Sequence, residues 1–226
     1  FIGVMDDILE LAHILSPGTI CGEGNVSGRD VNFKSDSFWI KASGTSLDTL
    51  KKEDLVACHL NGVPFSAKDK PSMEVLFHAW IYDNYEAVNF VAHTHPTNTN
   101  KILCSGSCHD FAEHRLFPDQ VVRNGRKSCL VPYATPGRLL RDEIKKQVGY
   151  FVEEEGFFPK LILLENHGII TTGSSYKDCV ASSLMCEKSA EIFVGARSLG
   201  QIQYLTKHEI MAVDKDPNEA YRRKIF

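Results

Sequence analysis

Apolar and polar positions follow a helical period in some segments of the chain and a strand-like pattern in others. Ile8, Leu11, Ala12 and Leu15 recur at helical spacing, and residues 16–18 (Ser-Pro-Gly) end that predicted helix. Further helices are predicted at residues 71–82, directly after Pro96, at 139–152 and at 177–199. Short apolar runs predict strands at residues 38–40, 55–60, 87–93, 129–133, 161–165 and 169–172.

The segments between these elements are polar, and we expect them to be loops. They are the glycine-rich stretch 21–29, the charged and proline-containing segment that ends near Arg126, and a charged tail from Lys207. Neither a repeat nor a low-complexity linker interrupts the pattern. We therefore predict an α/β fold in which helices pack on a central sheet, as a single domain over residues 1–226.

Composition narrows the functional class. The 226 residues carry 25 Lys+Arg and 29 Asp+Glu, a formal net charge of −4, which argues against a nucleic-acid partner. The longest apolar runs are far shorter than the ~20 residues that a membrane span needs, so no membrane partner is expected. Seven cysteines without a CxxC motif favour reduced thiols, and Asp6, Asp7 and Glu10 argue against a signal peptide. We expect a cytoplasmic protein.

Three histidines point to a metal site. His93 and His95 follow an apolar strand, and side chains two residues apart on a strand project to the same face. His167 follows a second apolar strand. Three histidines with a fourth position left open are typical of a catalytic zinc site, whereas a single HxH pair can equally be the polar edge of a strand. The other six histidines are interpreted as packed, capping or surface residues: His13, His59, His78, His109, His114 and His208.

A carboxylate and several small polar residues add to this picture. Glu74 is predicted on the first turn of a helix capped by Ser72, where it either fills the open metal position and carries a proton or simply interacts with the helix dipole. Asn25, Ser43 with Gly44, and Ser72 offer hydroxyl, amide and backbone N–H donors that suit an anion. Together with the histidines they suggest a phosphorylated substrate. Neither GxGxxG nor GxxxxGK[ST] occurs.

The order of the motifs resembles the class II aldolase/adducin family. The motifs are GNVSxR, SGTS, PSxE, HTHP, VPYxxPG and ENHG, and the resemblance extends from about Leu9 to Leu205. It implies a three-layer α/β/α fold around a largely antiparallel sheet, assembled as a homotetramer with sites between subunits. One departure is Met73, which stands where the aldolases often have a second serine.

The resemblance also implies roles for individual residues. The ligands of Zn²⁺ or another divalent metal are His93, His95 and His167, the acid/base is Glu74, and the phosphate-binding residues are Asn25, Ser43, Gly44 and Ser72.

The implied reaction is the cleavage of a ketose 1-phosphate to dihydroxyacetone phosphate and an aldehyde. Zinc polarises the carbonyl, and a second acid/base is Tyr133, Tyr221 or Glu113. The alternatives are an epimerase, which typically has aspartate in place of Glu74, a dehydratase, a decarboxylase, and a non-catalytic adducin-like interaction module. The last would be expected to lack the metal ligands.

Overall fold

The computed structural model describes residues 2–29 and 36–225, and its centre is a seven-stranded sheet. The strands lie in the order β3-β2-β1-β4-β7-β6-β5. All neighbours pair antiparallel except β5 and β6, which are parallel, so the sheet is mixed but largely antiparallel, as expected. Their bounds are β1 Asn25–Gly28, β2 Ser37–Lys41, β3 Leu55–His59, β4 Phe90–Thr94, β5 Cys129–Val131, β6 Leu161–Leu164 and β7 Gly168–Gly173.

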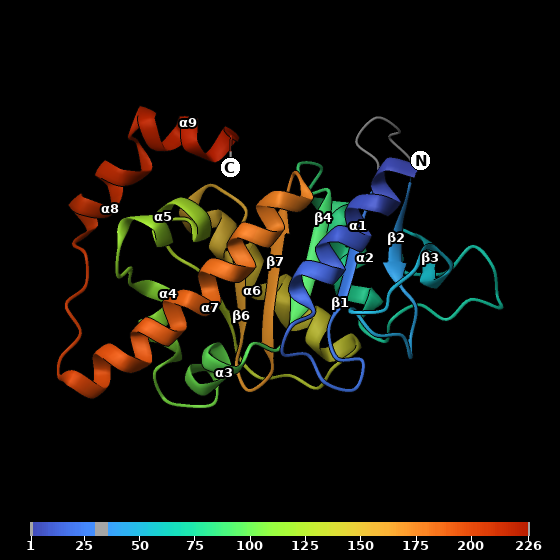
Figure 1. The fold of residues 1–226 in the computed structure, drawn as a ribbon, viewed down its shortest axis with the longest axis horizontal. Helices are drawn as coiled ribbons and strands as arrows, with labels where there is room; N and C mark the ends of the chain where they lie inside the picture. The colour runs from blue at the N-terminus through green and yellow to red at the C-terminus, as the bar shows by residue number, and fades with distance from the viewer. Residues whose placement is uncertain (1, 30–35, 226) are drawn as a thin grey trace.

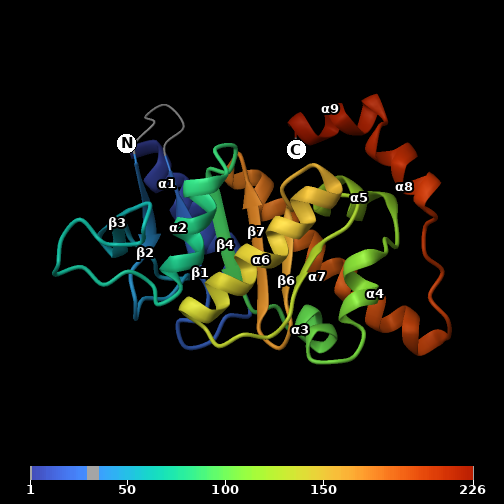
Figure 2. The same cartoon turned by 180° about the vertical axis from the view of Figure 1, so that it is seen from behind.

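Helices cover both faces of this sheet, which gives three layers. Helices α1 (Ile2–Leu15) and α7 (Tyr176–Leu199) lie in front of it in Figure 1, and α2 (Val75–Asn84) and α6 (Arg138–Glu155) cover the opposite face, seen in Figure 2. The shorter helices are α3 Thr97–Leu103, α4 Cys108–Glu113, α5 Pro118–Asn124, α8 Lys207–Asp214 and α9 Pro217–Ile225, and a 3-10 turn, Lys52–Asp54, precedes β3. The predicted α/β/α architecture is confirmed.

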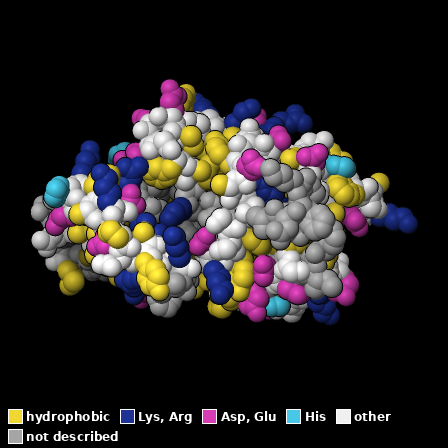
Figure 3. Space-filling view, turned by 90° about the horizontal axis from the view of Figure 1, so that it is seen from above, with side chains coloured by type: hydrophobic (Ala, Val, Ile, Leu, Met, Phe, Trp, Pro, Cys, Tyr) yellow, Lys and Arg dark blue, Asp and Glu magenta, His cyan; other side chains and the backbone are white. Residues whose placement is uncertain are grey.

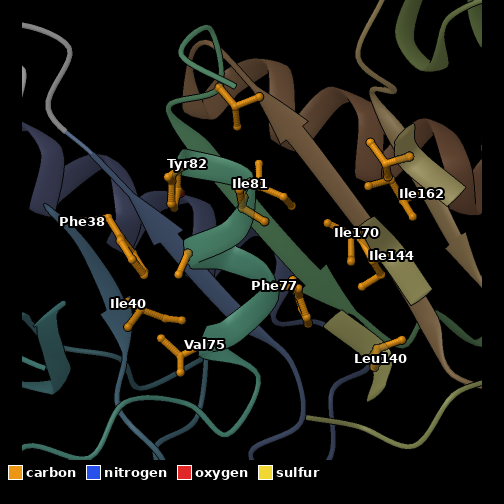
Figure 4. Close-up of a cluster of buried hydrophobic side chains, with 14 of the residues drawn as sticks. Phe38, Ile40, Val75, Phe77, Ile81, Tyr82, Leu140, Ile144, Ile162 and Ile170 are labelled. Carbon is orange, nitrogen blue, oxygen red and sulfur yellow. The ribbon is translucent and has the colours of Figure 1, made fainter. Parts of the chain in front are cut away.

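Each face of the sheet contributes to an apolar core. Figure 4 shows the core beneath α2 and α6, where Phe77 and Ile81 of α2 and Ile144 of α6 pack toward Ile170 of β7. Ile169, the neighbour of Ile170, points to the other face and packs in a cluster with α3, α4 and α7. Because both faces are covered, β6 and β7 are buried along most of their length, and β6 is apolar throughout instead of alternating with polar residues.

Three predicted loops contain regular structure. The glycine-rich stretch forms β1, whose Asn25 and Ser27 are polar but buried between β2 and β4. The charged segment before Arg126 forms α4 and α5, and the tail from Lys207 forms α8 and α9. Helices of six or seven residues, such as α4 and α5, are too short for a helical period to be visible. No helix in the described ranges 2–29 and 36–225 has the length and apolar character that crossing a bilayer requires.

Candidate active site

His93 lies in the middle of the sheet. It is on β4, directly opposite Asn25 of β1 on one side and Ile170 of β7 on the other, and its side chain is fully buried. Its Nδ1–H donates a hydrogen bond of 2.8 Å to the carbonyl oxygen of Ile169. A carbonyl oxygen can only accept, so this bond fixes the tautomer and leaves the Nε2 lone pair facing the site.

His95 and His167 approach His93 from the ends of two adjacent strands. His95 follows the last residue of β4, and His167 lies in the tight turn between β6 and β7, next to Asn166 with its left-handed φ of 56°. A Cβ on Gly168 would meet the carbonyl oxygen of Thr94 and would lie 2.6 Å from Cδ2 of His95. Only glycine therefore lets the start of β7 come this close to the end of β4, and this approach brings His167 to the other two histidines.

Glu74 completes the group but not from the predicted position. Helix α2 begins at Val75, and Glu74 is the residue before it, with φ −98° and ψ 17°. The prediction that Ser72 caps a helix carrying Glu74 on its first turn is wrong. Instead, the Ser72 hydroxyl accepts a hydrogen bond of 3.3 Å from the Glu74 N–H. This turn directs the Glu74 carboxylate to the histidines, with Oε1 3.2 Å from Nε2 of His93 and Oε2 3.7 Å from Nε2 of His167.

These four side chains could hold a metal ion. One ligand atom from each of Glu74, His93, His95 and His167 lies within 4.8 Å of the others. The Nε2 atoms of His93 and His95 are 3.0 Å apart, while Nδ1 of His95 faces the Glu23 carboxylate at 3.4 Å. Because each Nδ1 faces an acceptor, both Nε2 atoms present lone pairs to each other.

Such an arrangement of lone pairs is repulsive without a cation between them. Oε2 of Glu74 is also buried with no hydrogen-bond partner among the described residues, as is Nδ1 of His167. Three imidazole nitrogens and one carboxylate oxygen form a donor set that suits zinc and related divalent ions. The residues present therefore fit a divalent metal.

Burial and a neighbouring histidine favour the neutral form of His95 and His167, which is the form that binds metal. Burial and the neighbouring His93 lower the pKa of His167 to about 4, and the same two causes lower the pKa of His95. Burial alone would raise the pKa of Glu74, but the facing His93 and His167 outweigh it and hold this pKa at about 2. Glu74 is therefore an ionised carboxylate at neutral pH and can act as a base.

A pocket of about 370 Å³ opens beside the cluster, and all four predicted phosphate-binding residues line it. Asn25, Ser43, Gly44 and Ser72 share this pocket with Glu74 and His95. An extension of the sheet brings them together, since Ala42 pairs with Pro71 beyond the end of β2. The Ser43 N–H donates to the carbonyl of Lys70, and the Ser72 N–H donates to that of Lys41, both at 2.9 Å.

Lys41 is a pocket residue that sequence reasoning missed. Only 3 % of it is exposed, and its ammonium donates to the carbonyl oxygens of Thr45 at 2.5 Å and Gly22 at 3.3 Å. Burial lowers the pKa of Lys41. Two of its three N–H groups are used by these carbonyls, so one remains to face the pocket that Lys41 lines. A single lysine at the end of a strand has no motif that would have identified it.

A buried chain of hydrogen bonds supports Asn25 from behind. His78 Nε2 contacts Oδ1 of Asn25, His78 Nδ1 lies 2.6 Å from the Ser27 hydroxyl, and this hydroxyl lies 2.7 Å from that of Tyr82. Burial and the nearby His93 lower the pKa of His78 to about 3, so the ring is neutral. When Nε2 of His78 carries the proton, Oδ1 of Asn25 accepts a hydrogen bond from it, and the NH₂ group of Asn25 is directed toward the pocket. The expectation of a packed histidine at position 78 is confirmed.

The three candidates for the second acid/base lie elsewhere in this chain. Tyr133, Tyr221 and Glu113 are absent from the described residues that line the pocket around Glu74. Glu113 is paired with Lys127 at 3.6 Å, and the two tyrosines are more than half exposed. Met73 does line the pocket and is 83 % exposed.

Comparisons with known proteins find relatives over most of the chain. The chain is 28 % identical over 193 residues to a 3-oxo-tetronate 4-phosphate decarboxylase of Haemophilus influenzae. The matched region covers 85 % of this chain and 86 % of that protein. It is 30 % identical over 169 residues to an L-fuculose phosphate aldolase of Methanococcus maripaludis, over 75 % of this chain and 83 % of that protein.

A solved structure of an L-fuculose 1-phosphate aldolase has the same fold, with a TM-score of 0.77 and 21 % identity over 93 % of this chain and 94 % of that one. The model of the class II aldolase and adducin N-terminal domain matches residues 18–194, which include every candidate site residue from Asn25 to His167. The chain therefore belongs to the class II aldolase and adducin N-terminal domain family.

Proposed function

We propose that the protein is a zinc-dependent aldolase that cleaves a ketose 1-phosphate to dihydroxyacetone phosphate and an aldehyde. The observation that carries this proposal is the position of Glu74, whose carboxylate contacts the histidine cluster and also lines the pocket of anion-binding donors. A sugar phosphate held in that pocket would have its reacting carbons beside both a metal ion and a base. The similarity to L-fuculose phosphate aldolases supports this choice of reaction.

In this proposal His93, His95 and His167 hold the metal. A divalent ion bound there supplies Lewis-acid polarisation of the substrate carbonyl. The donors of Asn25, Ser43, Gly44 and Ser72 bind the phosphoryl group, and Lys41 adds a positive charge to the same pocket. These contacts fix the distance between the phosphate and the carbon atoms that react.

Glu74 transfers the proton in this scheme. In the direction of synthesis its carboxylate removes a proton from the hydroxymethyl carbon of dihydroxyacetone phosphate. In cleavage it takes up a proton from solvent and delivers it to the same carbon after the carbon–carbon bond breaks. The pKa of Glu74 is low enough that the carboxylate is ionised at neutral pH, which is the form that accepts a proton. The proton of the other hydroxyl needs a second group, and the described pocket residues include neither tyrosine nor Glu113. We therefore include a homotetramer in the proposal, in which a neighbouring subunit supplies this group.

A decarboxylase acting on a 3-oxo acid phosphate is the second candidate. The decarboxylase of Haemophilus influenzae matches 85 % of this chain, a share comparable with those of the L-fuculose phosphate aldolases. Lys41 also gives the pocket a buried cation that could bind a carboxylate. Both reactions leave negative charge on a carbon next to a carbonyl, so the same metal centre can serve either one.

A substrate panel separates the two candidates. Purified protein is incubated with the 1-phosphates of fuculose, rhamnulose, ribulose and 5-deoxyribulose while dihydroxyacetone phosphate is coupled to a reporting dehydrogenase, and with 3-oxo-tetronate 4-phosphate while released CO₂ is measured. The proposal expects dihydroxyacetone phosphate from at least one ketose and a loss of about 10²–10⁴-fold in kcat for Glu74→Gln with the metal retained. If CO₂ is released and no ketose 1-phosphate is cleaved, the proposed aldolase function is wrong and the decarboxylase function is supported.

A further inference from the structure

A second pocket lies at the opposite end of β7 from His167. It has a volume of about 390 Å³, and it is lined by Thr172 and Gly173 at the end of β7 together with residues of α5, α7 and α9. In Figure 1 this is the upper edge of the sheet, where β7 ends and α9 lies nearby. Its lining residues and those of the pocket around Glu74 have no member in common.

The charges around this second pocket are strongly unbalanced. Four cationic side chains line it, and the sole carboxylate among its described lining residues is that of Asp178. This carboxylate already accepts a hydrogen bond of 3.0 Å from the Ser174 hydroxyl. Figure 3 views the molecule from this side and shows several Lys and Arg side chains close together. The four cationic residues are Arg123, Lys160, Arg223 and Lys224.

The four cations differ in their ion pairs with the described residues. Arg223 is held in place, because its guanidinium donates to the carbonyl of Val122 at 3.3 Å and pairs with Asp214 at 3.4 Å. By contrast, neither Arg123 nor Lys160 makes a side-chain hydrogen bond or an ion pair with any residue that the structure describes. Desolvation, Arg223 and Arg123 outweigh the nearby carboxylates and lower the pKa of Lys160. The pocket thus concentrates positive charge that a bound anion would neutralise.

Part of the wall is apolar. Val88, Val122 and Phe158 line the pocket together with the cations, and Phe158 packs against Tyr85, with the two ring centroids 4.1 Å apart. Apolar walls with a few convergent charged groups are typical of small-molecule sites of this volume. A ligand that fits has a doubly charged anionic group at one end and an apolar or planar part at the other.

We propose that this pocket binds the phosphoryl group of a small phosphorylated metabolite, separately from the candidate active site, through Arg123, Lys160, Arg223 and Lys224. Arg123 and Lys160, which have no side-chain partner in the described part of the chain, and Arg223, which is fixed by Asp214, give the site its affinity for phosphate. The apolar wall with Phe158 accepts the organic part of the ligand. Because β7 connects this pocket to His167, the ligand would lie one strand length from the metal cluster.

Backbone amide chemical shifts of the protein test this proposal with three probes. Inorganic phosphate, AMP and adenosine are titrated separately, and the amides of Gly173, Ser174 and Ala181 report on the second pocket, while those of Gly24 and Gly44 report on the first. Saturable shifts of the first group with phosphate and AMP, and none with adenosine, are expected. Tighter binding of AMP than of phosphate would show that the apolar wall contributes, and equal binding would assign the affinity to the phosphoryl group alone.

Matched variants distinguish a built site from general surface charge. The Arg123→Gln, Lys160→Gln double variant should raise the half-saturating phosphate concentration at the second pocket by about tenfold or more, and leave the shifts at Gly24 and Gly44 unchanged. The control is Lys145→Gln, an exposed lysine on α6 outside both pockets, which should change neither group of shifts.

The unliganded double variant should also unfold at the same or a higher temperature than the wild type, since it removes like charges without removing a bond. If it does not fold, Arg123→Gln alone replaces it. The proposal is overturned if phosphate leaves the amides of the second pocket unshifted, if the double variant binds like the wild type, or if adenosine binds as well as AMP.

Discussion

Asn25 and His93 are direct partners across the antiparallel pair of β1 and β4. One belongs to the pocket of anion-binding donors, and the other to the cluster that could hold a metal ion. Their pairing places the two halves of the candidate site on neighbouring strands in the middle of the sheet. Backbone hydrogen bonds between the two strands would therefore set the distance from Asn25 to a bound metal.

Removing one histidine should remove the metal. We expect purified wild-type protein to contain about one divalent ion per chain, with zinc the principal element, and His95→Ala to lose it, because two histidines and a carboxylate bind more weakly than the full set. Elemental analysis by mass spectrometry measures this directly. The control is His109→Ala, an exposed histidine outside the cluster, which should keep its metal. Normal metal content in His95→Ala would contradict the assignment of the centre.

Gly168→Ala should damage the metal centre and the stability together. The new Cβ would overlap the Thr94 carbonyl and approach His95, so the start of β7 must move away from β4 at a cost of about 1–3 kcal/mol. Urea unfolding and metal content should both show the effect. The matched control is Gly149→Ala in α6, where a Cβ would meet nothing within 4 Å, and alanine should stabilise the helix by roughly 0.5–1 kcal/mol. Equal stability of the two variants would show that the close approach is unimportant.

Lys41→Met should weaken substrate binding through loss of a buried cation in the pocket. A charged hydrogen bond to a phosphate or carboxylate is worth about 1.5–3 kcal/mol, which corresponds to an increase of roughly 10–100-fold in KM. The increase should be much smaller for Lys41→Arg, which keeps the charge. Steady-state kinetics at two salt concentrations test both variants, and the KM of Lys41→Met should depend less on salt than that of the wild type. An unchanged KM in Lys41→Met would show that Lys41 does not bind substrate and only connects the loops at Gly22 and Thr45.

His78 should make the metal-free protein less stable in acid. Its pKa is about 3 in the folded chain against 6.5 for an ordinary histidine, so below pH 6.5 the unfolded chain binds a proton that the folded chain does not. The stability that neutral His78 contributes is complete above pH 6.5 and is lost as the pH falls toward 3, by up to about 1.4 kcal/mol per pH unit.

His78→Gln tests this, because glutamine can still donate to Asn25 but does not titrate. Urea unfolding in a chelating buffer between pH 4 and 8 should give a shallower decline for His78→Gln than for the wild type. Some decline should remain, since the lowered pKa values of His95 and His167 act in the same direction. Parallel pH profiles for the two proteins would contradict the role given to His78.

The residues of the metal cluster could be predicted because each follows a recognisable local pattern. His93 and His95 come at the end of an apolar strand, and His167 comes at the end of another. The order of the motifs indicated the family, and the resemblance to that family implied the role of each residue. The bounds of α6 and α7 and the end of α1 were predictable within about three residues, and for α1 and α6 the reason is that apolar positions repeat at a helical period.

The remaining features depend on contacts that are distant in sequence. Lys41 is held at the pocket because the loops at Gly22 and Thr45 supply carbonyl acceptors for its ammonium group. No sequence pattern in either loop predicts these hydrogen bonds. His78 becomes a support for Asn25 only when α2 packs on β1. Strand β1 was hidden because Asn25 and Ser27 are polar yet buried, so a pattern of apolar positions could not reveal it.

The hydrogen bond from His93 to the Ile169 carbonyl has one more consequence. It ties the protonation of a candidate ligand to the way in which two strands are paired, since Ile169 lies one residue from the direct partner of His93. Slipping β7 by one residue would turn its side chains to the opposite faces of the sheet and move that carbonyl out of reach. Metal uptake during refolding would then report on correct strand registry, so the ion would serve as a checkpoint for assembly of the sheet.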